Sequence, residues 1–168
     1  SPILERVIKN LDLNIYFEEV GDIMSSQILS YPFKFTYKIN PDSLKTKMSF
    51  NVISDENGLL VTNIEDGKEY IFTEFSTNGV THDLPFEITN IIKERCLDNS
   101  YNIFFVPTSN LISSLKKSIF VSQVGKNSDM ISLNIQNSNI EYSKRVLNEM
   151  IDVFNKDGVN DRQLIHKR

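Results

Sequence analysis

Apolar residues recur every three to four positions near both ends of the chain, which predicts a helix at each end. The first such pattern covers residues 3–11 and follows a serine and a proline, two residue types that favour helix starts. The second pattern covers residues 142–154 and follows Asn137 or Ser138, either of which can cap a helix. Gly158 is expected to interrupt or end this second helix.

Between the two ends, apolar and polar residues alternate with a period of two, which predicts short strands. The strongest turn signal is Asn57-Gly58, because both residue types tolerate positive φ in a tight hairpin. Further turns are expected at 65–68 and 78–79, and a short helix at 109–115. The predicted strands span residues 33–39, 48–52, 59–64, 70–75, 86–90, 101–106, 119–124 and 131–136.

The change of apolar period from helical to two and back predicts an α+β fold. We expect a single domain of 168 residues, in which 1–30 and 107–168 form an α/β core with a long C-terminal helix. Residues 31–106 are expected to form a β-rich insertion that is an antiparallel meander. Within the core, residues 15–30 are interpreted as a loop that can include one helical turn. The first and last helices should pack over a small sheet formed by 119–136.

Composition excludes several classes of protein. With 40% hydrophobic and 24% charged residues, the chain is typical of a folded domain, and its net charge of -4 gives no basic footprint for nucleic acid. The single cysteine, Cys96, cannot form an internal disulfide. No apolar run has the length of a membrane helix. The sequence begins with a helix start, so we interpret the chain as a piece of a longer protein. Membrane segments in that parent protein are therefore compatible with their absence from this sequence.

Few residues suggest chemistry. His82-Asp83 is the only neighbouring pair of an imidazole and an acid, and it can represent a base with its orienting partner. The simpler interpretation is a solvated loop histidine, because the second histidine, His166, lies in the polar C-terminal tail and two distant histidines with Cys96 make a poor metal set. A nucleophilic Cys96 would need a base that is not near it in sequence, so we expect a small buried thiol.

Charged pairs also have plain structural explanations. Glu18-Glu19 could act as paired carboxylates in glycoside hydrolysis, but adjacent acids in a loop usually only contact solvent. Lys116-Lys117 lies at the end of a predicted helix, where the helix dipole favours cations. No glycine-rich phosphate-binding motif is present. We therefore expect no catalytic, cofactor-binding or metal-binding residue in this chain.

Aromatic residues at strand spacing leave one binding hypothesis open. Such residues can stack against sugar rings, but at this spacing they more often form the core or cross-strand pairs. An exposed aromatic platform would favour a carbohydrate-binding or sensor module, with Tyr37, Tyr70 and Phe72 as its most plausible members. The aromatic groups at this spacing are Phe33, Phe35 and Tyr37, and Tyr70, Phe72 and Phe75.

Two stretches carry a family resemblance. The first is SPILERVIKNLDLNI at residues 1–15. The second spans residues 111–156 and has the order short helix, strand, turn of the form V-x-K-x-S, alternating strand and long helix, with VGKNS at 124–128. LPF at 84–86 and YNIFFVP at 101–107 fit the same order. In these features the chain resembles the extracytoplasmic domain of bacterial polysaccharide chain-length determinants, in the version with a large β-rich middle that is fused to a cytoplasmic tyrosine autokinase.

The resemblance implies a non-catalytic periplasmic domain of an inner-membrane protein. In that family two membrane helices flank the domain, the protein assembles into a homo-oligomer, and it governs the length or export of capsular polysaccharide or exopolysaccharide. The kinase motifs and tyrosine-rich tail are absent from this sequence, so no catalytic residue can be assigned from the family. Both membrane segments and the family's downstream coiled region are also absent.

Three classes of function therefore compete. An assembly module would use a large surface between subunits, a carbohydrate-binding or sensor module would use an aromatic platform, and a hydrolase would bring an acid and a base together, most plausibly at His82. For the isolated chain we expect a monomer or weak association, because the exposed helix positions are charged and we expect no apolar stripe outside the core faces. These positions are Arg6, Lys9, Lys144, Arg145, Glu149 and Asp152.

Overall fold

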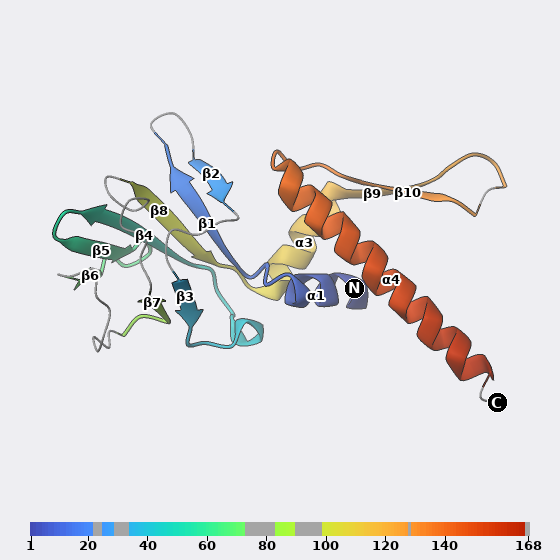
Figure 1. Ribbon diagram of the computed structural model, residues 1–168, viewed down its shortest axis with the longest axis horizontal. Coiled ribbons are helices and arrows are strands. Elements are labelled where there is room, and N and C mark those ends of the chain that lie inside the picture. Colours follow the sequence, from blue (N-terminus) through green and yellow to red (C-terminus); the bar gives the residue numbers. More distant parts are fainter. Residues whose placement is uncertain (22–24, 29–33, 73–82, 90–98, 128, 167–168) are drawn as a thin grey trace. The chain divides into compact units, whose positions relative to one another are not determined.

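The computed structural model describes residues 1–21, 25–28, 34–72, 83–89, 99–127 and 129–166 (Figure 1). For 25–28, 35, 89 and 159–166 it describes the backbone only. The helices are α1 (Pro2–Asn10), α3 (Thr108–Ser118), α4 (Ile140–His166) and the short 3-10 helix η1 (Pro41–Ser43). The strands are β1 (Ile15–Val20), β2 (Ser25–Ile28), β3 (Lys34–Tyr37), β4 (Met48–Asp55), β5 (Gly58–Asn63), β6 (Glu69–Phe72), β7 (Phe86–Thr89), β8 (Ser100–Phe105), β9 (Ile119–Gln123) and β10 (Ile131–Ile135).

All strand pairs in the described residues are antiparallel, and the fold is α+β, as the sequence predicts. The largest sheet has the order β2-β1-β8-β4-β5-β6. Two smaller sheets pair β9 with β10 and β3 with β7. The β9–β10 pair confirms the predicted small sheet. The expected meander is present as β4-β5-β6, but β3 pairs with β7 and not with the meander.

The hairpin between β4 and β5 confirms the predicted tight turn, shifted by one residue. Asp55 pairs with Gly58, so Glu56 and Asn57 form the loop. The shift has a local cause: the Asp55 carboxylate accepts hydrogen bonds from the backbone N–H groups of Asn57 (2.7 Å) and Gly58 (3.1 Å). Of these residues only Gly58 has a positive φ, at 153°.

The next turn joins β5 to β6 at the predicted position, 65–68. The side chain of Asn63 accepts a hydrogen bond from the backbone N–H of Glu65 at 2.9 Å, and the backbone carbonyl of Asn63 accepts one from Gly67 at 2.8 Å. Gly67 has φ 74°, a left-handed conformation that costs glycine little. The predicted turn at 78–79 lies outside the described residues.

Residues 15–30 are where the sequence-based prediction of a loop is wrong. Ile15–Val20 forms β1, which pairs with β8 on one side and with β2 on the other. Ile15 and Phe17 are buried, but Glu18 and Glu19 interrupt the apolar alternation, which explains why the pattern alone did not reveal a strand. Pairing with the neighbouring strand β8 stabilises β1 as a strand, although the sequence of β1 does not alternate regularly.

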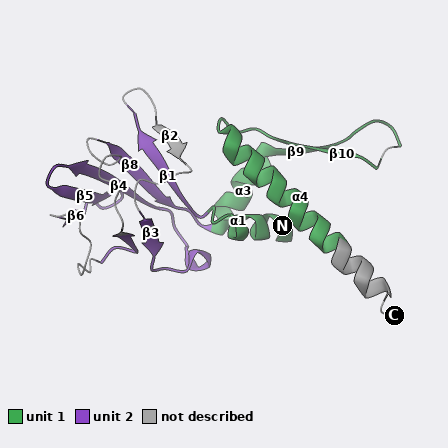
Figure 2. Cartoon of the chain, viewed as in Figure 1, with its two compact units in different colours: residues 1–13, 108–168 green, residues 14–107 purple. Residues whose placement is uncertain are grey.

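The chain divides into two compact units, shown in Figure 2. Unit 1 consists of residues 1–13 and 108–168, and unit 2 of residues 14–107. The boundary after residue 13 differs from the expected one at residue 30, because β1 and β2 belong to the sheet of unit 2. The two ends of unit 2 are tied together: the backbone N–H of Val106 donates to the Asn14 carbonyl at 2.7 Å, and the Asn14 side-chain amide donates to the Val106 carbonyl at 2.9 Å.

Each unit has its own hydrophobic core. The core of unit 2 combines aromatic and aliphatic residues, with Phe50 packed edge-on against Phe86 at 5.1 Å between ring centroids and against Phe105 at 5.9 Å. In unit 1 aliphatic residues from the three helices, together with Leu13 in the turn after α1, form the core. The buried residues of unit 1 are Leu4, Val7, Ile8, Leu13, Leu115, Val146 and Val153. Those of unit 2 are Ile15, Phe17, Phe50, Val52, Leu59, Val61, Leu84, Phe86, Ile88, Tyr101, Ile103 and Phe105.

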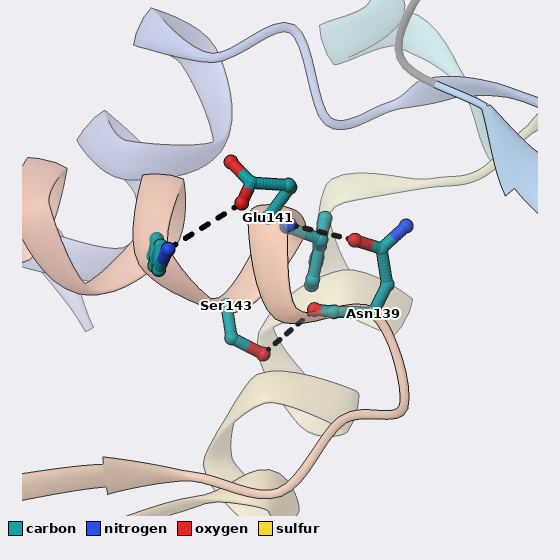
Figure 3. A network of polar contacts seen from close by, with 5 residues as sticks. Asn139, Glu141 and Ser143 are labelled. Carbon is teal, nitrogen blue, oxygen red and sulfur yellow. Dashed lines mark hydrogen bonds and ion pairs between the residues drawn. The ribbon is translucent and has the colours of Figure 1, made fainter.

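The cap of helix α4 is Asn139, one to two residues after the expected caps at Ser138 and Asn137 (Figure 3). The Asn139 side chain accepts a hydrogen bond from the backbone N–H of Tyr142 at 2.9 Å, the geometry of an N-cap. Asn137 instead supports the cap, because its side chain accepts from the Asn139 N–H at 2.8 Å. The helix continues through Gly158 to His166, so the interruption expected at Gly158 is wrong.

Helices α1 and α4 lie side by side in unit 1 and run in opposite directions. Arg6 forms an ion pair with Asp157, and the Asn10 side chain donates a hydrogen bond to Glu149 at 2.8 Å. As the chain advances along α1, the contacts therefore move back along α4. Helix α1 also packs against α3, while α3 contacts β9 and α4 contacts β10. The small sheet thus packs against the core of unit 1 through Ile119 and Ile135, which agrees only in part with the predicted packing, and the main contacts of α1 are with α3 and α4.

Candidate functional site

The candidates for acid–base or nucleophilic chemistry are only partly within the described structure. His82 and Cys96 lie outside the described residues. His166 is the last residue of α4, where only the backbone is described. Asp83 is exposed, and its carboxylate lies 3.5 Å from the Lys68 ammonium. Among the described residues no group of three or more histidine, cysteine or acidic side chains could hold a metal ion.

Lys68 connects two parts of unit 2. Its Nζ atom lies 5.1 Å from the centre of the Tyr70 ring. The interaction with Tyr70, and after it the one with Asp83, raises the pKa of Lys68 above its ordinary value. This arrangement has the features of a surface ion pair more than of a proton-transfer group.

Glu18 and Glu19 are not a carboxylate pair. They are neighbours on strand β1, so their side chains point to opposite faces of the sheet. Glu18 pairs across the strands with Asn102, and Glu19 with Tyr101. The expected loop is wrong, because both glutamates lie in strand β1. The sheet places their carboxylates on opposite faces, so they do not form a pair.

The proposed aromatic platform does not form around Tyr37, Tyr70 and Phe72. Tyr70 and Phe72 are half-buried and pack against the core of unit 2, which agrees with the core interpretation. Tyr37 is 38% exposed and belongs to the separate β3–β7 sheet. Phe33 and Phe75 lie outside the described residues, and for Phe35 only the backbone is described.

A different aromatic pair lies on the other face of the large sheet. Tyr16 and Phe104 stack with ring centroids 4.8 Å apart, and the Lys47 ammonium lies 4.5 Å from the centre of the Phe104 ring. The next cross-strand row on this face is polar. It contains Glu18, Asn102, Asn51, Thr62 and Glu69 in order across five strands.

Asn51 orders the centre of this polar row. Its side-chain amide donates to the Ser100 hydroxyl at 2.9 Å and to the Asn102 side-chain carbonyl at 3.0 Å. The row is therefore a set of oriented hydrogen-bonding groups beside an aromatic pair. Sequence alternation marks Asn51, Thr62 and Asn102 as outward-facing, but only strand order places the members of the row together.

The hairpin formed by β9 and β10 exposes apolar side chains, and it projects away from helix α4 of its own unit (Figure 1). Val121 is 63% exposed, and Ile131 is 61% exposed. Together with Gln123, Ser122 and Asp129 they line a shallow groove of about 420 Å³. The large apolar residues exposed on the hairpin are Phe120, Val121, Val124, Met130 and Ile131.

One face of this hairpin forms an apolar ladder of two apolar pairs, with Ile131 opposite the polar Gln123 at its outer end. Ile119 pairs with Ile135, and this innermost pair packs against the core of unit 1. Val121 pairs with Leu133, and beyond it Ile131 pairs with Gln123. The ladder thus continues outward past the helices that cover its first pair. The expectation that no apolar stripe lies outside the core faces is wrong, because alternation predicts the strands but not where the helices stop covering them.

No protein-family model matches the chain, and no curated protein is significantly similar to it. Among the described residues, none of the helices combines the length and the apolar character required to cross a bilayer.

Proposed function

We propose that this chain is the extracytoplasmic domain of a bacterial inner-membrane polysaccharide chain-length determinant, and that it acts as a non-catalytic assembly module. The proposal rests on the resemblance carried by residues 1–15 and 111–156. The parent protein would anchor the domain through flanking membrane helices, form a homo-oligomer, and carry a cytoplasmic tyrosine kinase. Its role would be to control the length and export of capsular polysaccharide or exopolysaccharide.

The observation that supports this proposal best is the direction of helices α1 and α4. Arg6 contacts Asp157, whereas Asn10, further along α1, contacts Glu149. The start of α1 therefore lies beside the C-terminal part of α4. A polypeptide that continued beyond both helices would leave unit 1 on the same side, which is the arrangement that two membrane helices in one bilayer require.

A second feature agrees with an insertion into such a domain. Unit 2 begins and ends at adjacent positions, because Asn14 and Val106 exchange two hydrogen bonds. A β-rich unit can therefore be carried between α1 and α3 while unit 1 keeps its own core. This is the order expected for the kinase-fused version of the family, with its larger β-rich middle.

The decisive experiment is deletion of the parent gene followed by sizing of the surface polysaccharide by gel electrophoresis. We expect a loss or a changed length distribution, restored by the intact gene. A second complementing gene would lack residues 14–107, with a short glycine-serine linker in their place, and would report whether unit 1 alone restores the amount or the length. An unchanged amount and length distribution after deletion would refute the assembly role.

A carbohydrate-binding module is the second candidate, and one observation favours it. The stacked pair Tyr16 and Phe104 lies beside the polar row centred on Asn51. Aromatic rings and oriented amides are the groups that bind sugars through stacking and hydrogen bonds. Titration of the chain with the surface polysaccharide of its source bacterium tests this candidate. Loss of binding in Asn51→Ala would support it, and absence of binding by the unaltered chain would refute it.

A further inference from the structure

The hairpin β9–β10 has open edges in the part of the chain that the structure describes, where its sheet contains two strands. A strand edge that is long, apolar and uncharged invites pairing with another strand, and most proteins protect such edges with charges, prolines or bulges. Neither β9, IFVSQ, nor β10, ISLNI, contains a charged residue or a proline. The hairpin therefore combines unprotected edges with the exposed apolar ladder.

The backbone groups at the outer edge belong to the same residues that form the ladder. The Val124 N–H donates to the Met130 carbonyl at 2.9 Å, and the Gln136 N–H to the Ser118 carbonyl at 2.8 Å. Hydrogen-bonded pairs alternate in an antiparallel ladder, so Leu133 lies in a pair whose backbone groups point away from the partner strand. An additional strand on the β10 edge would therefore bind the backbone there and extend the apolar face at the same time.

Charge distinguishes the two edges as sites for a second copy. Strand β9 lies between two cationic positions, because Lys116 and Lys117 are in the last turn of α3 and Lys126 follows the strand, so two β9 strands paired antiparallel would bring these cations of the two copies toward each other at both ends. Like charges opposite each other destabilise a strand pair. If two β10 strands paired about Leu133, Ile131 would lie opposite Ile135, and Asp129 would lie opposite the neutral Asn137. The β10 edge is thus compatible with itself, whereas the β9 edge is not.

We propose that β10 is a self-association edge, at which two copies of this chain pair antiparallel about Leu133 and join their hairpins into one four-stranded sheet. The inference rests on the proposed function in one respect, because it names the surface by which anchored copies would meet. Five residues of strand measure only about 17 Å, so the pairing buries far less than the roughly 800 Å² per partner of a stable complex. Association of the free chain is therefore weak, and confinement to a membrane would strengthen it.

Cross-linking through a single cysteine tests the pairing in the isolated chain. Cys96→Ser removes the native thiol, and Leu133→Cys then places one thiol at the centre of the proposed pair. Mild oxidation at rising protein concentration should give a disulfide-linked dimer, because paired Cα atoms about 5.5 Å apart are within disulfide range. Adding 8 M urea before oxidation should prevent this dimer, because the pairing requires the folded strand. Val121→Cys is the matched control, since it lies on the same face but would be about 14 Å from its copy, three strand spacings away.

A second pair of variants separates pairing from general stickiness. Ile131→Lys in the Leu133→Cys background should abolish the dimer, because the new ammonium group would face the apolar Ile135 of the other copy. Ile71→Lys is its control, because Ile71 is equally exposed, at 64%, but lies in unit 2. Ile71→Lys should leave cross-linking unchanged. A new charge in β10 should therefore abolish the cross-linked dimer, whereas the same charge in unit 2 should not.

The outcomes are distinct from those that test the proposed function. Equal cross-linking at positions 121 and 133, cross-linking at neither, or a dimer that survives Ile131→Lys would overturn the proposed pairing. The readout uses the isolated chain, so such a result would leave the polysaccharide role standing. Conversely, cross-linking at 133 with an unchanged polysaccharide after gene deletion would refute the role and leave the interface standing.

Discussion

The separation into two cores makes a quantitative prediction about stability. Val146 in α4 and Val61 in β5 are both fully buried, each in the core of a different unit. Val121 has the same side chain but is 63% exposed on the hairpin. Substituting alanine at each position removes the same two methyl groups from three environments. The comparison therefore measures burial alone, apart from the backbone preferences of helix and strand.

The expected magnitudes follow from the buried area that is lost. Removing two methyl groups from a core costs about 1.6 kcal/mol of transfer free energy, and the cavity left behind adds to this cost. In a helix, part of that loss is offset by about 0.5 kcal/mol, because alanine favours helix more than valine does. We expect Val146→Ala to lower the free energy of unfolding of unit 1 by about 2 kcal/mol and Val61→Ala to lower that of unit 2 by about 2 to 3 kcal/mol. Val121→Ala should cost less than about 1 kcal/mol.

The assay must resolve the two units, because a spectroscopic signal averages over both. Urea unfolding followed by circular dichroism gives the size of each loss. Hydrogen exchange measured by mass spectrometry on proteolytic peptides then locates it. Val146→Ala should reduce protection in residues 1–13 and 108–158 and spare the buried strands of unit 2. Val61→Ala should do the reverse.

Two results would refute this reasoning. If Val121→Ala were as destabilising as Val146→Ala, the hairpin valine would be buried in solution and the exposed ladder would not exist. If either core substitution reduced protection uniformly across the whole chain, the two clusters would unfold as one cooperative unit and the division into separate cores would carry no energetic meaning.

Three further predictions concern single features of unit 1. Burial raises the pKa of Tyr142 above its ordinary value near 10, although Arg145 lowers it in part, so the contribution of this tyrosine to the free energy of unfolding should decrease as pH rises above about 10, and Tyr142→Phe should lessen the loss of stability in that pH range in denaturant titrations. Asn139→Ala removes the cap of α4 and should cost about 1 kcal/mol, whereas Asn148→Ala, an exposed change in the middle of the same helix, should be neutral or slightly stabilising in thermal unfolding. Replacing residues 14–107 with a short flexible linker should leave unit 1 folded with its helical circular dichroism signal, because its core contains no residue from unit 2; an unfolded product would contradict this.

Much of the local structure could be predicted from the sequence. Helical spacing predicted α1, α3 and α4, and alternation with turn residues predicted the hairpins β4–β5 and β9–β10. These features depend on neighbours a few positions apart, so the chain encodes them locally. The predictions failed by small shifts where a side chain competed for the backbone, as when Asp55 moved the hairpin turn by one residue and Asn139 took the cap position from Asn137.

The candidate sites were less predictable from the sequence. Residues considered for catalysis either lie outside the described structure or are separated by it, as Glu18 and Glu19 are on opposite faces of β1. The polar row around Asn51 joins residues that are far apart along the chain, and no local pattern indicates that they share a row. Cross-strand neighbours are determined by strand order, which the sequence pattern left open.

The amino-acid sequence by itself thus determined the periodicities, the approximate positions of the β4–β5 and β5–β6 turns and the α+β class, because these follow from the side chains of each short segment. Only the tertiary structure decided that 15–20 is a strand, since its order comes from pairing with β8. It also decided that β3 pairs with β7 and not with the meander, and that the helices of unit 1 do not cover the outer pairs of the β9–β10 ladder. The alternation within a strand determines which of its faces is apolar. Whether that face is covered depends on the positions of the helices α1, α3 and α4, which the alternation does not determine.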